Sequence, residues 1–516
     1  GYGYDKDGIV LDVEIKDSKI TDVKVKRAKE SEFATPAIQE IAKKVVATQS
    51  LDVDGISGAS LTSEGTKEAI EEAVKKSGIT LTTVTVQNVR TVEFPKETDV
   101  VVIGAGGAGL TSAIAAHEKG AKVILIEKTE LLGGNTNYAT AGLNAAGTKI
   151  QEKLGVKDSP ELFYEDTMKG GKNKNNKELV RVLVNNSSAI VDWLIERGAD
   201  LSELTSTGGQ SAKRTHRPTG GTAVGPNIVA ALSKTAENEK IDIRKGTKAI
   251  ALVKTKNRIV GVKVREIDGK EYTIKAKAVI VATGGFGANA KMVEKYNPKL
   301  KGFGSTNSPA IVGDGIIMVE KVGGALVDMS EIQTHPTVVY NKTNMITEAV
   351  RGEGAILVNK DGKRFIDELE TRDVVSKAIL SQKGKSAFLI FDEDIRTKLK
   401  AADGYVKKGF AVEGTLEEIA AKIGTDAKTL EATLNKYNEA VRDKVDSEFN
   451  KKTLPKELTG TKYYAIEVSP AVHHTMGGVR INTNAEVLGK NGRPIKGLYA
   501  AGEVTGGIHG ANRIGG

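Results

Sequence analysis

The chain has 516 residues, 39% of them hydrophobic, with a formal net charge of +9, so it is long enough for three or four domains. The absence of cysteine excludes disulfides, thiolate catalysis, iron–sulfur clusters and cysteine zinc sites, and we expect no metal site. Aromatic residues make up only 4% and basic residues are interspersed with acidic ones, which argues against nucleic acid binding, and no apolar run reaches the roughly 18 residues that would span a membrane.

The first elements predict a small α+β domain over residues 1–80. Residues 9–26 alternate apolar and polar side chains on both sides of a turn, which is typical of a β-hairpin. Pro36 opens an amphipathic helix, and a second helix is expected to end at Gly78. An extended linker over residues 81–97 follows.

Between the two expected helices lies the stretch "DGISGASLTSEG", from Asp54 to Gly65. It combines small residues with two serines and a threonine. One interpretation is a surface loop that caps the next helix and carries incidental hydroxyls. The other is a loop that lets a large group approach one of those hydroxyls.

From residue 98 the pattern changes to strand, glycine turn, helix and strand, which is a βαβ unit. Gly104, Gly106 and Gly109 form G-x-G-x-x-G directly after the first strand. Such glycines allow a tight turn, approach of a pyrophosphate to the helix N-terminus, and close helix–sheet packing. Glu127, at the end of the second strand, is placed to bind a ribose hydroxyl. The sequence therefore predicts a dinucleotide site.

Further strand-like runs lie far downstream, in "KAVIVATGG" and "GLYAAGE". We expect them to join the same sheet, so that another domain is inserted in the chain between them. The predicted fold is α/β, with a Rossmann-like domain over residues 98–329 and 474–516 and an α+β capping domain over residues 330–473.

Several ordered motifs then carry a family resemblance. With the glycine turn and Glu127, the stretches "ELLGGNTNYATAGLNAA", "VATGGFG", "VGDGI" and "YAAGEV" make residues 98–516 similar to the soluble FAD-dependent fumarate reductases, including flavocytochrome c and urocanate reductases. The resemblance implies non-covalent FAD, because no histidine occurs between His117 and His216 to attach it. Together with the fingerprint, it gives these FAD-binding positions: Gly104, Gly106, Ala108, Gly109, Glu127, Gly134, Asn135, Thr136, Ala141, Gly142, Ala249, Asp314, His474 and Glu503.

The resemblance also implies a proton relay. Arg372, in "TRD", matches the arginine that protonates the substrate, and Glu348 and Arg351 match the pair that resupplies the proton. Glu348 and Arg351 lie three residues apart and would share one face of a helical turn. The alternative is a surface ion pair of little energetic value. Arg364 matches no catalytic position, and we interpret it as structural.

Two groups of residues match the substrate-binding positions of that family. His473 and Arg513 would hold one carboxylate, and His335 and Thr347 the other, with the N–H of Gly516 nearby. Glu348 also belongs to this pocket. For any single histidine, a purely structural role remains the alternative. This pattern favours fumarate, while urocanate or another acrylate remains an alternative substrate on the same scaffold.

The stretch from Asp54 also resembles the flavinylation motif of FMN-binding domains, D-x-x-S-G-A-[ST]-x-[ST]. In that family a flavin transferase joins FMN phosphate to the last hydroxyl, which here is Thr62. FMN on Thr62 would be the entry for electrons from a donor that the sequence does not identify, and FAD the exit to the substrate.

Some alternatives stay open. A flavin electron-transfer module without its own substrate and an aspartate-oxidase-like flavoenzyme share parts of this pattern. The positive charge indicates either a solvated surface or attraction to an anionic substrate or envelope surface. The chain begins with Gly, which leaves room for a removed signal or anchor, and we expect an extracytoplasmic protein of anaerobic respiration. The resemblance also implies a further helix after residue 516.

Overall fold

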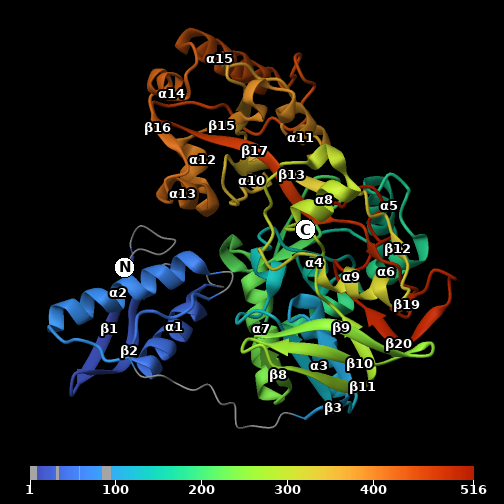
Figure 1. Cartoon of the computed structure of the whole chain (residues 1–516). Helices are drawn as coiled ribbons and strands as arrows, with labels where there is room; N and C mark the ends of the chain where they lie inside the picture. Colours follow the sequence, from blue (N-terminus) through green and yellow to red (C-terminus); the bar gives the residue numbers. More distant parts are fainter. Residues whose placement is uncertain (1–7, 29, 31–33, 57–58, 84–94, 516) are drawn as a thin grey trace.

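The computed structural model describes residues 8–28, 30, 34–56, 59–83 and 95–515. Within these ranges the chain forms an amino-terminal domain, a central domain built on an eight-stranded sheet and an inserted domain built on a five-stranded sheet (Figure 1). None of the helices in these ranges has the length and apolar character needed to cross a membrane.

The amino-terminal domain has the predicted hairpin and both predicted helices. Its elements are β1 (Ile9–Lys16), β2 (Lys19–Ala28), α1 (Thr35–Thr48) and α2 (Ser60–Ser77). Pro36 lies in the first turn of α1, where its missing N–H has no helical partner to lose. Gly78 ends α2 with a left-handed φ of 70°. The apolar faces of both helices pack against the hairpin in one cluster that contains Ile20, Ile41 and Ile70.

The central sheet joins strands that are far apart in the chain. In spatial order they are β19 (Glu486–Leu488), β20 (Pro494–Ala500), β10 (Arg258–Glu266), β11 (Glu271–Val281), β3 (Glu97–Ile103), β4 (Val123–Glu127) and β8 (Asp242–Lys245), with β9 (Thr247–Thr255) paired to β10. β20, β11, β3, β4 and β8 pair in parallel. The two downstream strands therefore join the βαβ unit, as predicted.

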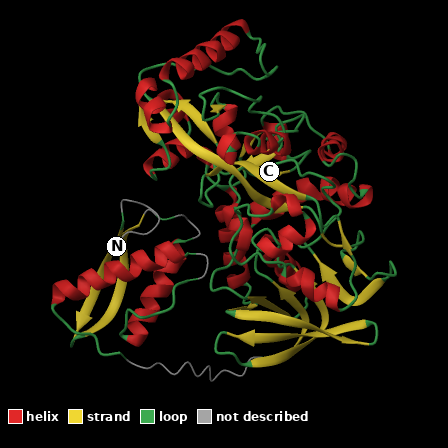
Figure 2. Ribbon diagram, turned by 45° about the horizontal axis from the view of Figure 1, so that its top comes forward, coloured by secondary structure: helices red, strands yellow, loops and turns green. Residues whose placement is uncertain are grey.

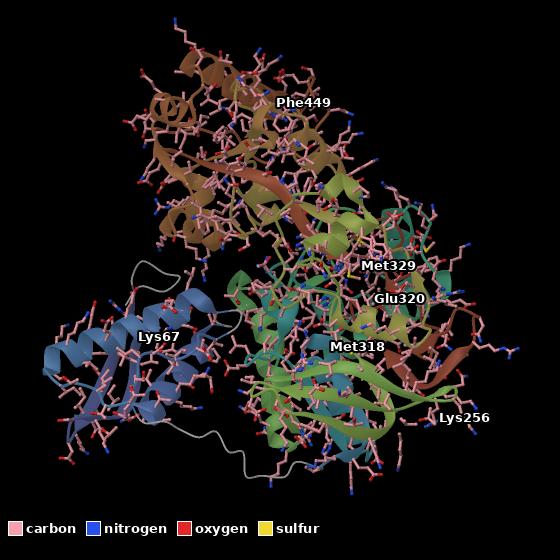
Figure 3. The ribbon with its side chains drawn as sticks, in the orientation of Figure 1. Lys67, Lys256, Met318, Glu320, Met329 and Phe449 are labelled. Atoms are coloured by element: carbon pink, nitrogen blue, oxygen red, sulfur yellow. The ribbon has the colours of Figure 1, made fainter. Side chains whose placement is uncertain are left out.

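Helices pack on both faces of this sheet (Figure 2). Val101 and Val102 alternate along β3 and point to opposite faces. The face of Val102 is covered by α3 (Gly107–Glu118), α6 (Lys177–Glu196) and α7 (Val224–Asn238). The face of Val101 is covered by α8 (Ala290–Tyr296) and α9 (Asp314–Lys321). Met318 of α9, labelled in Figure 3, belongs to this second core.

The central domain also contains several smaller elements outside the main sheet. They are α4 (Lys149–Lys153), α5 (Pro160–Gly170), the 3₁₀ turn η1 (Gly134–Tyr138), the sheet of β5 (Leu143–Asn144), β7 (Thr215–Arg217) and β6 (Glu203–Thr205), and the pair of β12 (Leu326–Val327) and β18 (Gly478–Val479).

The inserted domain has its own sheet and its own core. The strands are β13 (Ile332–Val339), β17 (Tyr463–Thr475), β15 (Ala387–Asp392), β14 (Ile356–Val358) and β16 (Val412–Gly414), and the helices are α10 (Glu348–Gly352), α11 (Arg372–Leu380), α12 (Glu393–Lys398), α13 (Lys400–Lys407), α14 (Leu416–Ile423) and α15 (Ala427–Asp443). The long strand β17 runs from this domain back toward the central domain (Figure 1). The segments that carry the predicted substrate-binding residues lie near this junction, where the chain also ends.

Candidate active site

The glycine turn after β3 is shaped as the fingerprint predicts. Gly104 has φ of 99°, and a Cβ there would lie 2.5 Å from the carbonyl oxygen of Ala282. A Cβ at Gly109 would lie 1.7 Å from the carbonyl oxygen of Gly104. Both positions therefore require glycine, which brings α3 close to the sheet and aims the start of α3 at the cavity beyond the strand ends.

A cavity opens at this turn, and most of the predicted FAD-binding residues line it. They are Gly104, Gly106, Ala108, Glu127, Gly134, Asn135, Thr136, Ala249, Asp314 and Glu503. Four other predicted positions, Gly109, Ala141, Gly142 and His474, lie outside this lining, and their contact with a flavin stays a prediction. The lining fits a dinucleotide because helix N–H groups can bind a pyrophosphate and carboxylates can bind sugar hydroxyls.

Two of the carboxylates at the cavity, Glu127 and Asp314, already have protein partners. Glu127 accepts hydrogen bonds from the N–H of Ala105 at 2.9 Å and from the N–H of Thr129 at 2.9 Å. These bonds fix the turn and the segment after β4 around the acid. Asp314 pairs with Lys128 at 2.6 Å and lies 3.7 Å from Lys248. The ribose and ribityl contacts predicted for both acids would add to these bonds.

A second set of side chains joins η1 to the strand ends. The amide of Asn135 donates to Oδ1 of Asn307 at 2.6 Å and to Glu503 at 3.5 Å, and its carbonyl accepts from the N–H of Ser308 at 2.8 Å. Burial raises the pKa of Glu503. Asn307 and Ser308 did not stand out in the sequence, because neither belongs to a recognisable motif.

The predicted proton relay is assembled and buried. Glu348 and Arg351 both lie on α10, and Nε of Arg372, at the start of α11, lies 3.5 Å from Oε2 of Glu348. The side chains of Arg372 and Glu348 are 11% and 18% exposed, and Arg351 is fully buried. The alternative that Glu348 and Arg351 form a surface ion pair is therefore wrong, because both side chains are buried or nearly so.

Charges around the relay shift its acid–base properties. Burial alone would raise the pKa of Glu348, but Arg351, Arg372 and the N–H of Gly208 outweigh it and lower that pKa. Burial lowers the pKa of Arg351, Glu348 opposes the shift, and Arg372 adds to it. Glu348 is therefore ionised at neutral pH. Arg351 holds its proton less tightly than an exposed arginine.

His335 and His473 face each other, with ring centroids 5.4 Å apart. The N–H of Thr337 donates to Nδ1 of His335 at 3.3 Å, so the neutral ring carries its proton on Nε2. That Nε2 has no hydrogen-bond partner among the described residues. Nδ1 of His473 shares a hydrogen bond of 2.7 Å with the hydroxyl of Thr306. Burial and the charge of Arg372 lower the pKa of both histidines well below 6.5.

His474 points toward the cavity acid rather than toward His473. Its Nδ1 lies 3.3 Å from Oε1 of Glu503, and its ring stands edge-on to His509, with centroids 5.7 Å apart. Burial and the charge of Arg513 lower the pKa of His474 well below 6.5 and that of His509 to about 3. These two histidines are therefore neutral, and His474 lies next to Glu503, which lines the cavity.

The last described residues are bound against the relay. Nε2 of Gln333 donates to the carbonyl of Arg513 at 2.7 Å, and the hydroxyl of Thr207 donates to the carbonyl of Gly515 at 2.6 Å. A Cβ at Gly515 would lie 3.0 Å from Nη2 of Arg372, so a larger residue would crowd the arginine. Burial and Arg372 lower the pKa of Arg513 to about 10. The predicted contact of Gly516 lies outside the described residues.

Thr347 precedes α10, and its N–H donates to the hydroxyl of Tyr405 at 3.1 Å. Nη1 of Arg372 is buried without a hydrogen-bond partner among the described residues. Unpaired donors on Arg372 and His335, close to further cationic groups, form a buried cluster that a small anion would satisfy. Tyr405, Gln333 and Thr306 support this cluster, and the sequence motifs did not reveal them.

The hydroxyl of Thr62 lies in the first turn of α2 and donates to Oε2 of Glu30 at 2.5 Å. Thr62 is only 2% exposed, so a transferase reaching this hydroxyl needs the carboxylate to move aside. Ser63 has a different role: its hydroxyl accepts from the N–H of Ile56 at 2.9 Å and donates to the carbonyl of Ala59 at 2.9 Å. Ser57 and Gly58 of the motif lie outside the described residues.

Two family models match the chain. The model described as an FAD binding domain matches residues 99–516, and the model described as an FMN-binding domain matches residues 3–75. Both matches agree with the cavity after β3 and with the motif before α2. The chain thus contains an FAD-binding domain and an FMN-binding domain.

Similar proteins and a similar solved structure agree with these family matches. The NADH:fumarate oxidoreductase of Klebsiella pneumoniae is 45% identical over 94% of this chain, which spans about half (52%) of that protein. The fumarate reductase (cytochrome) of Shewanella frigidimarina is 50% identical over 81% of this chain and 74% of its own length. The solved open conformation of a flavocytochrome c3 fumarate reductase superposes with a TM-score of 0.73 at 44% identity, covering 81% of this chain and 75% of that one.

Proposed function

Since the chain belongs to the FAD-dependent fumarate reductase family, we propose that it reduces the carbon–carbon double bond of a small unsaturated dicarboxylate, with fumarate as the substrate and succinate as the product. The observation that supports this most directly is the buried cluster in which Glu348 lies between Arg351 and Arg372, beside two neutral histidines. This cluster provides proton donors and anion-binding groups at one place.

In the proposed reaction one alkene carbon receives a hydride and its neighbour receives a proton. A bound, reduced FAD supplies the hydride. A guanidinium N–H of Arg372 supplies the proton, and Glu348 and Arg351 return a proton to Arg372. The lowered pKa of Arg351 supports this assignment, because an arginine at its ordinary pKa gives up a proton too reluctantly to serve as a relay.

We propose that the two carboxylates of the substrate bind at opposite ends of the pocket. Arg513 and His473 would bind one, and the hydroxyl of Thr347 and Nε2–H of His335 the other. The unsatisfied Nε2 supports this arrangement, because a buried donor gains a full hydrogen bond when a carboxylate arrives. Holding both ends can also twist a carboxylate out of conjugation, which makes the alkene a better hydride acceptor.

Electrons would enter through FMN attached to Thr62 by a flavin transferase and pass to FAD in the central domain. The match to the FMN-binding family and the position of Thr62 in the first turn of a helix support this route, since a helix N-terminus favours a phosphate. The donor that reduces FMN is not specified by these features. An extracytoplasmic location stays a prediction, which fractionation of expressing cells would check.

A comparison of substrates tests the proposal. With a reduced artificial donor, kcat/KM is measured for fumarate, acrylate, methacrylate, cinnamate and urocanate. A monocarboxylate leaves one end of the pocket unpaired, at a cost of about 1–3 kcal/mol, so fumarate should be reduced at least about ten-fold more efficiently. If urocanate or an aryl acrylate is the better substrate, the roles of His335 and Thr347 are wrong, and reduction of a different enoate replaces the fumarate assignment.

A further inference from the structure

The amino-terminal domain contacts the central domain at the segment that follows Glu127. Nζ of Lys44, on α1, lies 2.9 Å from Oε1 of Glu130. The two side chains are 27% and 25% exposed, so the pair is partly shielded from water. The same Nζ lies 3.4 Å from the carbonyl oxygen of Asp54, the first residue of the flavinylation motif. Lys44 therefore connects the motif of one domain to the other domain.

Leu131, the next residue after Glu130, contacts both cofactor-binding domains. It packs against the hydrophobic cluster of the amino-terminal domain, which includes Ile41 and Val45 of α1. It also lines the cavity of the central domain. Leu131 thus contacts both the core of the first domain and the cavity of the second.

This contact is also tied to the cavity acid. The hydroxyl of Thr129 donates to the carbonyl of Leu131 at 2.7 Å, and the N–H of Thr129 donates to Glu127 at 2.9 Å. Because Glu127 lines the cavity, a ligand that orders Glu127 also orders the segment that Lys44 contacts. Binding in the cavity and contact between the domains should therefore favour each other.

We propose that the Lys44–Glu130 pair and Leu131 form the docking contact through which the FMN-binding domain passes electrons to FAD within one chain. This inference rests on the proposed function, in which FMN is the entry and FAD the exit. The step conserves electrons and protons: FMNH₂ is oxidised to FMN by loss of two electrons and two protons, and FAD gains the same to become FADH₂.

The contact between the two domains is weak enough to form and break reversibly. One partly exposed ion pair contributes modestly and is weakened by salt, and Leu131 adds one apolar side chain. Such a contact can open when the amino-terminal domain accepts electrons from a donor or meets the transferase. It can then close again without diffusion of a separate partner, because the chain keeps the local concentration of the domain high.

The first test is geometric and does not depend on activity. Zero-length carbodiimide coupling of the flavin-loaded protein joins a lysine amine to a nearby carboxylate as an amide, while the carbodiimide takes up the water. Peptide mapping should find Lys44 joined to Glu130, and raised salt should reduce the yield. Lys43 is the matched control, because it is adjacent on α1 but pairs with Glu40 of its own helix at 3.1 Å. Coupling of Glu130 to Lys43 instead, or to neither lysine, overturns the docking contact.

The second test follows electron transfer. Fully reduced protein is mixed with excess fumarate without oxygen, so that a fast phase reports oxidation of FAD and a later phase reports oxidation of FMN through FAD. Lys44→Glu and Glu130→Lys should each slow the later phase about ten-fold at low salt, because attraction becomes repulsion. The fast phase should not change. The double swap should restore the later phase, and Lys43→Glu should leave it at the wild-type rate.

The outcomes separate the inference from the function on which it rests. If FMN of the wild-type protein stays reduced while FAD is oxidised, the proposed entry of electrons through FMN fails, and the docking role fails with it. If FMN is oxidised equally fast in the wild type and in Lys44→Glu, the proposed function stands and only the docking role is refuted. A double swap as slow as the single variants also refutes it.

Discussion

Replacement of Glu368 by glutamine should slow fumarate reduction, although Glu368 lies away from the substrate pocket. Its carboxylate is fully buried and pairs with Arg364 and Lys451, each at 2.9 Å. Arg364 also pairs with Asp446 at 3.0 Å and lies near the ring of Phe449, which is labelled in Figure 3. These contacts agree with the interpretation of Arg364 as structural, which stays a prediction.

The connection to the relay is the main chain of the same residue. Arg351 donates from Nη1 to the carbonyl of Glu368 at 2.5 Å, while its Nε and Nη2 have no partner among the described residues. Arg372 follows Glu368 by four residues. A shift of this segment therefore moves both arginines, and a misplacement of about 1 Å can reduce a rate by about 100-fold.

The expected effect of Glu368→Gln has two parts, one on stability and one on kcat. Removing one partner of a buried pair costs about 3–5 kcal/mol of stability, because Lys451 keeps its charge without a carboxylate. In addition, the negative charge of Glu368 raises the pKa of Arg351 against the effect of burial, so its removal lowers that pKa further. If a protonated Arg351 is required, kcat should fall about 10- to 100-fold, and the alkaline limb of its pH profile should move to lower pH.

The assay compares kcat, KM and the pH profile in Glu368→Gln and in the double variant Glu368→Gln/Lys451→Met. The double variant removes one charge of each sign and should fold better, yet it should keep the shifted pH limb. Glu413→Gln is the matched control, because Glu413 forms an exposed pair with Lys462 in the same domain. A folded double variant with wild-type kcat would refute the positioning role, and so would a lower kcat with an unchanged pH profile.

Three further predictions concern the site itself. Arg372→Ala should reduce the rate of fumarate reduction by at least about 10²–10⁴-fold with unchanged FAD content, and near-normal turnover would remove this arginine from the mechanism. Thr62→Ala should abolish the FMN adduct seen by intact mass after co-expression with a flavin transferase, and an adduct that survives the change would exclude Thr62 as the attachment site. His335, His473 and His474 have pKa values well below 6.5 in the folded protein, so the unfolded chain binds more protons as the pH falls below about 6.5. Unfolding of the flavin-free protein by denaturant should therefore show a stability loss of up to about 1.4 kcal/mol per histidine per pH unit, and a constant stability between pH 7 and 5 would contradict the burial of neutral rings.

Local sequence patterns predicted several elements of the fold. The hairpin and both helices of the amino-terminal domain have strong periodicity. The parallel strand β4 is instead a short, continuously buried apolar run. Gly104 and Gly109 were predictable because no other residue fits their positions. The residues proposed for catalysis and substrate binding came from resemblance, since an isolated Arg372 or His335 has no periodic or spacing signal.

The sequence did not reveal the contacts between residues that are far apart in the chain. Arg364 and Asp446 are 82 positions apart, and Lys44 and Glu130 are 86 positions apart. Neither pair lies in a motif, and both involve ordinary charged residues in a chain with 141 of them (75 basic and 66 acidic). Only the folded chain shows which charge meets which, because that choice follows from the packing of whole domains rather than from local propensity.

The arrangement of charges bears on the proposed role of an arginine as the acid. Glu348 is held ionised between Arg351 and Arg372, so it has a free carboxylate to receive a proton and does not retain it. Burial lowers the pKa of Arg351, and burial together with Arg372 lowers that of Arg513 to about 10. An incoming dicarboxylate adds two negative charges beside these cations and raises the pKa of each arginine. This opposes the effect of burial and keeps each guanidinium protonated until the reaction begins. The first carbon–hydrogen bond formed with hydride places negative charge on the neighbouring carbon, next to Arg372. In the proposed mechanism, proton transfer from Arg372 then neutralises that charge, and the proton lost would be replaced through Glu348.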